Sequence, residues 1–237
     1  MAKTIRLDKL LGHCGWGTRR QIKELCKGGA VFVNHACCKD SSIKVDPQTA
    51  QIQVQGETVC YEEFYYLMLH KPQGVLSATE DRFTATVLDL LSQQYQGASL
   101  FPVGRLDKDT TGLLLLTNDG TWAHRITSPK KHIDKVYEAS VAGTIPADIE
   151  KQFREGIVLA DGLQCLPAQV SSIGPQQLRI TVQEGKYHQV KRMCAAVGLT
   201  VTALHRCSIG ALVLDSSLEP GQYRRLTEAE KDLPFCE

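Results

Sequence analysis

The sequence lacks the features that mark membrane-inserted, secreted and disulfide-bonded proteins. No apolar run approaches the roughly twenty residues that cross a bilayer, and residues 1–6 show no apolar stretch leading to a small-residue cleavage site. The nine cysteines are odd in number and contain no Cys-x-x-Cys pair, which favours reduced thiols over bridges or zinc. Adjacent Cys37 and Cys38 allow a redox role, but the simpler interpretation is that they are two small residues on opposite faces of a strand. We therefore expect a cytoplasmic protein that contacts no membrane and holds no metal.

Motifs for the common nucleotide and hydrolase chemistries are also missing. There is no Gly-x-Gly-x-x-Gly after a strand, no Walker loop, no His-Glu-x-x-His and no Gly-x-Ser-x-Gly. Dinucleotide, ATP and zinc-hydrolase activities thus have no support in the sequence. The composition, with 43% apolar and 22% charged residues, is that of a globular protein. A chain of 237 residues can form one large domain or two unequal ones.

Charge is unevenly distributed along the chain. Residues 1–60 carry nine basic and five acidic side chains, a net charge of +4, whereas the other 18 basic and 21 acidic side chains give −3. A basic head on a nearly neutral body predicts that one end of the protein binds a polyanion.

Two short helices and a small sheet are expected in the first sixty residues. Apolar residues at 7, 10 and 11 have helical spacing, and Thr18 begins a Thr-x-x-Gln capping box ahead of a second helix that ends at Gly28-Gly29. Residues 31–33 and 52–54 have strand character, with a turn at Asn34-His35.

Cations gather on these two helices. Arg20, Lys23 and Lys27 share one face of the second helix, and Arg6 and Lys9 lie one turn apart on the first. Arg19 adds to this patch. A solvated helix surface would have the same pattern, but with so few compensating acids we favour a nucleic-acid contact.

The rest of the chain, after a boundary near residues 60–63, alternates strands and helices. Helices are predicted near 86–91, after 118–120, at 148–153 and at 189–197, with a last one opened by Thr227-x-x-Glu230. Strands are predicted near 64–69, 101–103, 113–117, 136–141, 168–172, 178–182 and over 201–214. Because several strands follow one another directly, we predict an α+β fold with a mixed, largely antiparallel β-sheet and flanking helices.

The segment Gly104–Gly112 is the strongest candidate for a reactive site. It holds Asp107 and Asp109 on a glycine-bounded connection between two apolar strands, where a carboxylate is rigidly held and partly desolvated. An EF-hand is disfavoured, because the twelfth loop position is Asn118 rather than Glu. A plain polar turn has the same spacing and stays an alternative.

Two further segments combine cations with an aromatic residue. Residues 184–193 open a helix with Lys186, Lys191 and Arg192, a setting that suits phosphate. Residues 128–137 place Tyr137 behind three lysines, which suits a stacked base. Either His188 or His205 could be a base, although a hydrogen-bonding role fits each of them. Together with the basic head, these segments indicate a nucleic-acid enzyme with an essential carboxylate.

These motifs resemble those of a known family. Residues 104–107 followed by 111–120 closely resemble the signature of the ribosomal-RNA pseudouridine synthases, and residues 135–137 and 184–193 resemble that family's next two motifs. Residues 4–60 resemble an S4 RNA-binding domain. The resemblance implies an S4-like domain at 1–60 and a catalytic domain at 61–237. Details at 109–112 and 122–129 are most similar to the branch acting on small-subunit (16S) rRNA.

The resemblance also implies a reaction and its residues. A uridine loses its C1′–N1 bond, the uracil turns, and C5 joins the sugar, with no metal or cofactor. Asp107 matches the catalytic aspartate, Tyr137 the residue stacked on the flipped base, and Lys191 the cation paired with the aspartate. Arg105 matches the residue filling the vacated space, and Ile209 a hydrophobic neighbour of the base. The substrate-binding candidates are Arg105, Ile209, Lys186 and Arg192.

A neighbouring cation makes chemical sense, because at about 4 Å it favours the ionised carboxylate by on the order of 4 kcal/mol at an effective dielectric of 20. One departure concerns Ser208, which stands where the family usually has Arg before Ile-Gly, while Arg206 lies two residues earlier. An RNA or ion contact at this position is therefore in question.

The expected partner is 16S rRNA, free or in a partly assembled small ribosomal subunit, bound by a monomer. Two alternatives are kept: a synthase acting on large-subunit (23S) rRNA, which would use the same catalytic residues, and a non-catalytic rRNA-binding or ribosome-assembly protein that uses the basic head alone.

Overall fold

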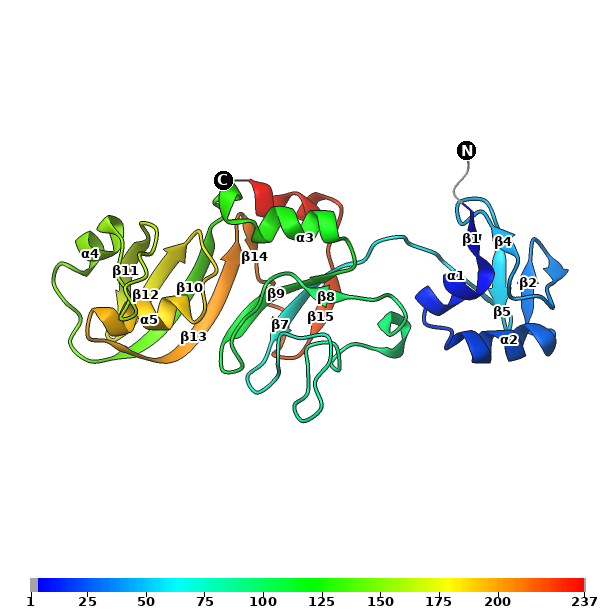
Figure 1. Ribbon diagram of the computed structural model, residues 1–237, viewed down its shortest axis with the longest axis horizontal. Coiled ribbons are helices and arrows are strands. Elements are labelled where there is room, and N and C mark those ends of the chain that lie inside the picture. The colour runs from blue at the N-terminus through cyan, green and yellow to red at the C-terminus, as the bar shows by residue number, and fades with distance from the viewer. Residues whose placement is uncertain (1–3, 237) are drawn as a thin grey trace. The chain divides into compact units, whose positions relative to one another are not determined.

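The computed structural model describes residues 4–236, which fall into two units (Figure 1). Unit 1 comprises residues 4–65 and 91–100, and unit 2 comprises residues 66–90 and 101–236. No local sequence pattern indicated that residues 91–100 belong to unit 1. Within the described part of the chain, none of the helices has the length and apolar content required to cross a bilayer.

Unit 1 contains two helices and two small antiparallel sheets. Helices α1 (Leu7–His13) and α2 (Arg19–Lys27) come before most of the strands. The four-stranded sheet has the order β3-β2-β5-β6, made of β3 (Ala36–Cys37), β2 (Val31–Val33), β5 (Ile52–Val54) and β6 (Glu57–Thr58). The second sheet pairs β1 (Ile5–Arg6) with β4 (Lys44–Val45). The leucines of α1 pack with Ile22, Val31 and Val54 in one core.

Local sequence signals explain the start of α2 and the turn after β2. Thr18 Oγ1 accepts a hydrogen bond from Gln21 N, and the Gln21 side chain accepts one from Thr18 N, so the predicted capping box is confirmed. Asn34 and His35 both have positive φ values, 50° and 65°, as a two-residue hairpin turn requires. The predicted strands at 31–33 and 52–54 are confirmed as well.

Residues 91–100 contact the end of α1 and the glycine-rich segment that follows it. The short 3-10 helix η1 (Gln93–Tyr95) places the Tyr95 ring edge-on against Tyr65, with centroids 5.5 Å apart. A Cβ atom at Gly97 would stand 1.6 Å from the carbonyl oxygen of Gly12. This approach of backbone to backbone is possible because residue 97 has no side chain.

Unit 2 is built on one nine-stranded sheet. Its main path has the order β11-β12-β10-β13-β9-β7-β15, with β14 on β13 and β8 on β9. The strands are β7 (Tyr66–Lys71), β8 (Phe101–Pro102), β9 (Thr111–Thr117), β10 (Lys135–Ala142), β11 (Gln169–Gly174), β12 (Gln177–Val182), β13 (Thr200–Ile209), β14 (Leu212–Val213) and β15 (Tyr223–Arg225). Among the described strands β13 and β9 run parallel and the other pairs are antiparallel, which confirms the predicted fold class.

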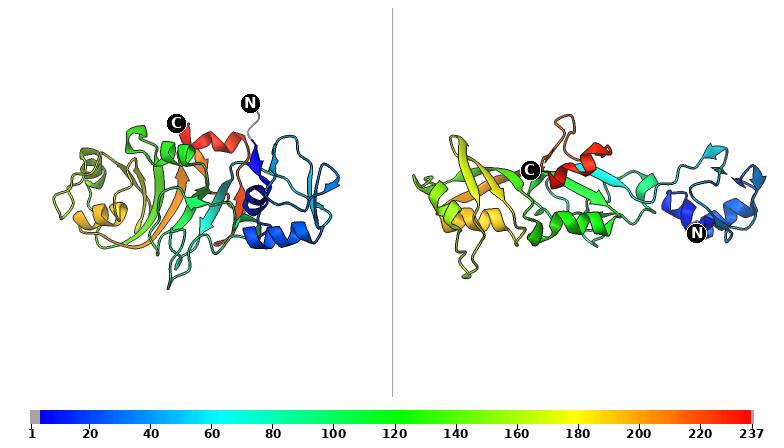
Figure 2. Two further views of the ribbon diagram at one scale, coloured as in Figure 1. Left: turned by 45° about the vertical axis from the view of Figure 1, so that its right-hand side comes forward. Right: turned by 90° about the horizontal axis from the view of Figure 1, so that it is seen from above.

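Helices cover the two halves of this sheet separately, as the further views in Figure 2 also show. Helices α4 (Ile149–Glu155) and α5 (Gln189–Ala196) pack over β10, β11 and β12 in one apolar cluster. Helix α3 (Gly120–Thr127) packs over β8 and β9 in a second cluster that also includes residues from the C-terminal end. Asp119 caps α3 by accepting hydrogen bonds from Thr121 N and Trp122 N.

The parallel pair β13–β9 joins the two halves and depends on a glycine. Gly112 has φ +105°, and a Cβ there would stand 2.3 Å from the carbonyl oxygen of Arg206. Gly112 is opposite Arg206 in this pair, and Arg206 is also opposite Tyr137 in the antiparallel pair β13–β10. Strand β13 therefore links the strand after Asp107 to the strand that carries Tyr137.

Two predicted helices are wrong. Residues 86–91 form turns, because Thr86 N and Oγ1 donate to the Asp89 carboxylate and Val87 N donates to Leu76 O instead of joining a helix. The C-terminal segment forms two 3-10 turns, η3 (Ala229–Lys231) and η4 (Leu233–Phe235), with Pro234 unable to donate a helical hydrogen bond. The predicted pairing of Thr227 with Glu230 is present nevertheless.

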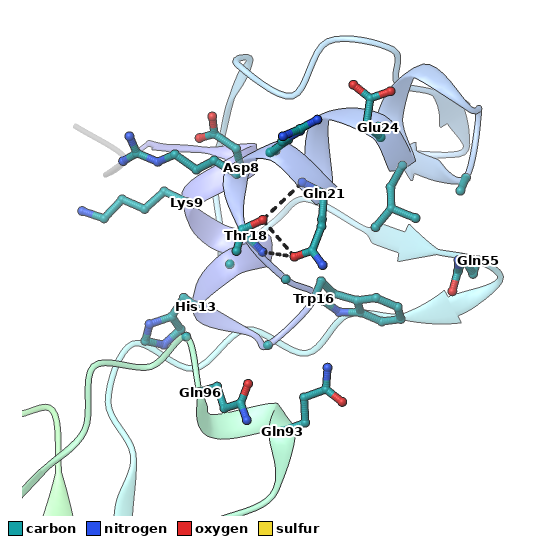
Figure 3. A pocket seen from close by; sticks show the side chains of 18 of the residues that line it. Asp8, Lys9, His13, Trp16, Thr18, Gln21, Glu24, Gln55, Gln93 and Gln96 are labelled. Carbon is teal, nitrogen blue, oxygen red and sulfur yellow. Dashed lines mark hydrogen bonds between the residues drawn. The ribbon is translucent and has the colours of Figure 1, made fainter. Parts of the chain in front are cut away.

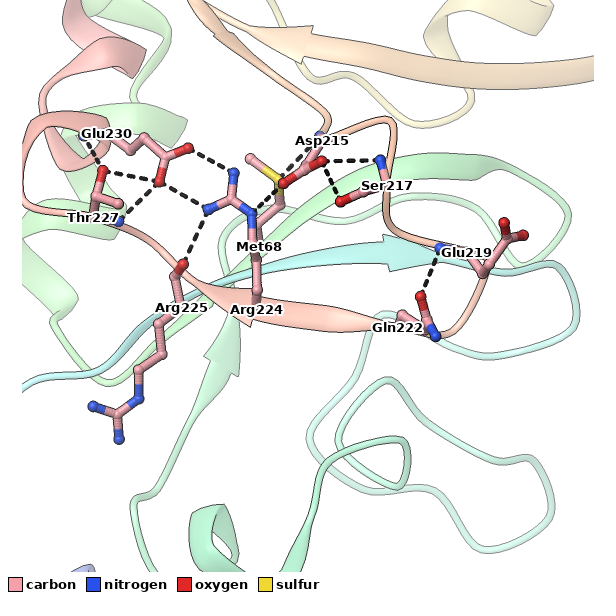
Figure 4. A network of polar contacts seen from close by, with 9 residues as sticks. All are labelled: Met68, Asp215, Ser217, Glu219, Gln222, Arg224, Arg225, Thr227 and Glu230. Atoms are coloured by element: carbon pink, nitrogen blue, oxygen red, sulfur yellow. Dashed lines mark hydrogen bonds and ion pairs between the residues drawn. The ribbon is translucent and has the colours of Figure 1, made fainter.

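A polar network attaches these C-terminal turns to the edge of the sheet (Figure 4). Arg224, on edge strand β15, donates to Asp215 Oδ2 at 2.6 Å and to both carboxylate oxygens of Glu230 at 2.6 and 2.8 Å. Ser217 donates to Asp215 through its backbone N and its hydroxyl. The Arg224 guanidinium thus links edge strand β15 to the C-terminal turns.

Candidate active site and nucleic-acid interface

The Asp107 loop, residues 105–110, connects β8 to β9, and the buried side chain of Lys71 forms hydrogen bonds with its backbone. Lys71 Nζ donates to the carbonyl oxygens of Thr110 at 2.9 Å, Pro72 at 3.0 Å and Lys108 at 3.3 Å. Burial lowers the pKa of Lys71 to about 8. Two of these three carbonyls belong to the loop, so Lys71 fixes the backbone on which Asp107 stands.

Neighbouring residues of the 72–77 segment hold the same loop. Gly74 N donates to Lys108 O at 2.9 Å, and Gln73 Nε2 donates to Asp109 O at 3.2 Å. The buried hydroxyl of Ser77 donates to Leu106 O and accepts from Leu106 N. Leu106 directly precedes Asp107, so both sides of the catalytic candidate are bonded to this segment.

Lys191 on α5 is placed between two carboxylates of the loop. Its Nζ lies 3.1 Å from Asp107 Oδ2 and 2.5 Å from Asp109 Oδ1. Burial lowers the pKa of Lys191, but the hydrogen bonds to Asp109 and Asp107 outweigh it and leave the pKa raised. The same contact lowers the pKa of Asp109. The Asp107 side chain is 25% exposed, so it is neither buried nor open to bulk water.

His188 is a second nitrogen-bearing side chain beside Asp107. It has φ 48° at the residue before α5, and its Nε2 lies 3.5 Å from Asp107 Oδ1. Its ring stacks on Tyr187, with centroids 3.8 Å apart. His205 contacts Thr111 Oγ1 at 2.9 Å instead. Of the two histidines considered as a base, only His188 lies at the aspartate.

A narrow pocket of about 60 Å³ opens next to Asp107. Its lining includes Arg105, Tyr137, Lys186, His188 and Leu204. Pockets that enclose ligands usually have roughly 300–1,000 Å³, so this lining must move to admit a nucleoside. The predicted carboxylate, aromatic residue and guanidinium therefore share one pocket, with Lys191 beside its carboxylate.

Other predicted substrate residues are engaged within the protein. Ile209 is 1% exposed and packs in the β8–β9–α3 core, outside the pocket lining. Arg192 pairs with Asp161 at 2.5 Å, and Lys186 pairs with Glu184 at 2.8 Å. A phosphate bound by Arg192 or Lys186 would have to compete with these carboxylates. Substrate contact by these three residues stays a prediction.

Arg206 is 4% exposed and lies behind Tyr137. Its Nε donates to Leu113 O at 2.8 Å, and its Nη1 is 3.5 Å from the Tyr137 hydroxyl. Ser208, which replaces the family arginine, is also buried. The nearby arginine therefore braces the aromatic residue from inside the sheet, whereas position 208 offers no guanidinium to solvent.

A hollow of about 1,190 Å³ lies along α1 and α2 of unit 1 (Figure 3). Residues 93–99 close one side of it, with Gln93 and Gln96 near Trp16. Three of the predicted RNA-binding cations line it: Lys9, Arg19 and Arg20. A cationic hollow with an aromatic wall suits single-stranded nucleic acid.

The six predicted RNA-binding cations differ in their pairing. Arg6 is bound to Asp8 at 2.6 Å, and Lys27 to Glu24 at 3.3 Å. Within residues 4–236, no ion pair is made by the remaining four, which are Lys9, Arg19, Arg20 and Lys23. Their charge is therefore available to phosphates.

Sequence reasoning missed the roles of Asp109, Lys71 and Ser77 in building the site. Asp109 could have been inferred, because it lies two residues from Asp107 in the same loop. Nothing in the sequence around Lys71 and Ser77 distinguishes them from ordinary polar residues near a turn. Their function follows from the pairing of β7 with β9, which brings Lys71 opposite Gly112 at the end of the loop.

The chain belongs to the RNA pseudouridylate synthase family, whose profile matches residues 65–196, and it carries an S4 domain matched at residues 5–50. It is therefore an isomerase that acts on RNA, and its fold is that of the family.

Among its relatives is the Bacillus subtilis RNA pseudouridine synthase YtzG, 47% identical over 97% of this chain and 98% of that protein. Ribosomal small subunit pseudouridine synthase A of Vibrio cholerae is 44% identical over 95% of this chain and 97% of that protein. A pseudouridylate synthase of known crystal structure shares 39% identity over 97% of this chain and 99% of that one, with a TM-score of 0.69.

Proposed function

We propose that this protein converts a uridine of small-subunit (16S) rRNA to pseudouridine. The observation that carries the proposal is the Asp107–Lys191 ion pair at 3.1 Å, set in a pocket that also contains Tyr137 and Arg105. The small-subunit assignment is supported by relatives named ribosomal small subunit pseudouridine synthase A, over nearly the whole chain.

Each site residue has a role that its surroundings support. Asp107 is the reactive carboxylate, since its side chain is 25% exposed, whereas Glu184, the other carboxylate lining the pocket, is 11% exposed and is bound to Lys186, Gln189 and Leu166 N. Lys191 places its ammonium 3.1 Å from Asp107 Oδ2, beside the reacting group. Tyr137 offers a ring to the extruded uracil, and Arg105, which is exposed, occupies the space left in the RNA.

The reaction is balanced without a co-reactant. The C1′–N1 bond breaks, the uracil turns within the pocket, and a C1′–C5 bond forms. The proton lost from C5 is matched by one gained at N1, so substrate and product have the same composition. Extruding the base costs a few kcal/mol, and one aromatic stack returns roughly 1–3 kcal/mol. Contacts to the RNA by the unpaired cations of unit 1 supply the rest.

The partner is 16S rRNA, either free or in a partly assembled small subunit, bound by a monomer in the cytoplasm. The test is the map of pseudouridines in both rRNAs of a deletion strain. We expect one uridine of 16S rRNA to stay unmodified and to be restored by the wild-type gene. Loss of a pseudouridine from 23S rRNA alone would refute the small-subunit assignment. If both rRNAs keep all their pseudouridines, a non-catalytic binding protein is favoured.

The variant Asp107→Asn tests the chemistry directly. We expect no pseudouridine from this variant at any enzyme concentration, with RNA affinity within about twofold of wild type, because only the reacting carboxylate is lost. Asp148→Asn, at an exposed position before α4, is the matched control and should turn over normally. Product formation by Asp107→Asn at the wild-type rate would contradict the assignment.

A further inference from the structure

We propose that Phe83, in residues 77–85 (the Phe83 loop), is a second contact to the substrate RNA and stacks on an unpaired base near the target uridine. This inference rests on the proposed function and extends it to a residue outside the pocket. None of the motifs that indicated the family includes this loop.

The Phe83 ring stands almost entirely in water. Its exposure is 95%, compared with 76% for Tyr187, which is stacked on His188, and 42% for Phe64. An aromatic side chain can remove 150–250 Å² of surface from water when it is covered. Contacts within the chain bury almost none of the Phe83 ring, so burial of this surface by a partner would still be favourable.

The exposure of Phe83 is imposed by an ordered turn. Asp81 Oδ1 accepts hydrogen bonds from Phe83 N and Thr84 N, both at 2.9 Å. These two bonds lower the pKa of Asp81, so the carboxylate is charged and holds the turn at neutral pH. At the base of the loop, Leu76 N donates to Ala85 O at 2.9 Å. Because the backbone that carries the ring is already ordered, binding costs little additional backbone entropy.

The loop is attached to the catalytic candidate at its other end. Ser77 Oγ is 2.9 Å from Leu106 O and 3.1 Å from Leu106 N, and Leu106 precedes Asp107. Phe83 is six positions along the chain from Ser77, so it lies within roughly 20 Å of this bond. When the target uridine of an RNA lies at Asp107, nucleotides near that uridine are therefore close enough to contact Phe83. Figure 1 shows the loops of this region, in teal, projecting below β7.

The charges of the Phe83 loop favour a base over a phosphate as the group bound. Glu80 and Asp81 offset Arg82 and the neighbouring Lys108 in formal charge, so the loop has no excess of cations. A π-face stacks on any base without regard to sequence, whereas phosphate binding needs unbalanced cations. Arg82, which precedes Phe83 in the sequence, adds a planar cation that can contact the same base.

The test compares Phe83→Ala with Phe83→Trp on a 16S rRNA fragment that contains the modified uridine. Loss of one stacked base weakens binding by roughly 1–3 kcal/mol, or about 5- to 150-fold. We expect KM for the fragment to rise by at least about fivefold in Phe83→Ala, while kcat and the melting temperature stay unchanged. In Phe83→Trp, KM should return to the wild-type value. Val213→Ala, at a 62% exposed position on β14, is the control and should leave KM unchanged.

Failure of this inference is separable from failure of the proposed function. The dissociation constant for the fragment is also measured in an Asp107→Asn background, where turnover plays no part, and Phe83→Ala should raise it by the same factor. Equal affinity with and without the ring would overturn the proposal. Unchanged KM for naked RNA combined with slower modification of assembling subunits would also overturn it and assign the ring to a protein partner. Absence of product from wild type would count against the proposed function alone.

Discussion

Lys191 is shared between two carboxylates, and this sharing defines the site at the scale of single residues. A lysine with one partner can follow that partner when it moves. Asp109 gives the Lys191 ammonium a second carboxylate partner in the same loop. The ammonium therefore keeps one charged contact in the loop if its bond to Asp107 is broken.

Replacing Lys191 by Met should lower kcat by about tenfold to a hundredfold. The full Coulomb interaction at 3.1 Å is on the order of 5 kcal/mol at an effective dielectric of 20, and the partial exposure of Asp107 reduces it. Asp109→Asn should cost much less, because it leaves the Asp107 contact in place. The measurement is single-turnover formation of pseudouridine at saturating RNA. Wild-type kcat in Lys191→Met would show that the ion pair has no catalytic role.

At the scale of elements, α2 presents charge that the rest of unit 1 does not neutralise. Its capping box sets where the helix begins, and its apolar residues Ile22 and Cys26 face the core. The cations at 19, 20 and 23 are left on the exposed side without ion-pair partners among the described residues. Lys27, on the same helix, is paired with Glu24.

Changing Arg19, Arg20 or Lys23 to Gln should flatten the salt dependence of RNA binding. Each lost phosphate contact removes roughly 0.7–0.9 from the slope of log affinity against log salt concentration. Lys27→Gln is the matched control on the same helix, and its effect should be smaller because Glu24 already neutralises that charge. Binding of a 16S rRNA fragment between low and moderate salt gives the slopes. Identical slopes in all four variants would assign this face of α2 to solvent.

At the scale of the whole molecule, acid stability depends on the network around Arg224. Hydrogen bonds from Ser217, followed by that from Arg224, lower the pKa of Asp215 to about 2. Arg224 lowers the pKa of Glu230 to about 2. Both carboxyls titrate at higher pH when the chain is unfolded. Their contribution to stability is therefore complete above about pH 4.5 and is lost as the pH falls towards 2.

Arg224→Met should remove part of this contribution. We expect the free energy of unfolding at pH 7 to fall by about 1–2 kcal/mol, after allowance for solvent screening of Glu230, and its decline between pH 4.5 and 2 to become shallower. Lys151→Met, which removes an exposed pair with Glu155, is the control and should change little. Urea unfolding at several pH values provides the test. A parallel decline in Arg224→Met and wild type would rule out this source of acid sensitivity.

Local chemistry predicted the elements whose signals are complete within a few residues. The capping box at Thr18 and Gln21, the hairpin turn at Asn34-His35 and the strand at 113–117 need only their own neighbours, and all are present. The helix predicted at 86–91 failed because its backbone bonds to Leu76, ten residues earlier in the chain. The motifs also placed Asp107, Tyr137 and Lys191 as site candidates, through their resemblance to a family.

The sequence by itself determined the class of fold, the basic residues 1–60 and the loop that holds the catalytic candidate, because periodicity, charge and motif spacing are properties of neighbouring residues. Only the tertiary structure decided that Lys191 bridges Asp107 and Asp109, that buried Lys71 and Ser77 hold the loop, and that residues 91–100 belong to unit 1. Those contacts join residues far apart in the chain. They form because strand pairing and helix packing bring side chains together whose separation in sequence carries no record of the contact.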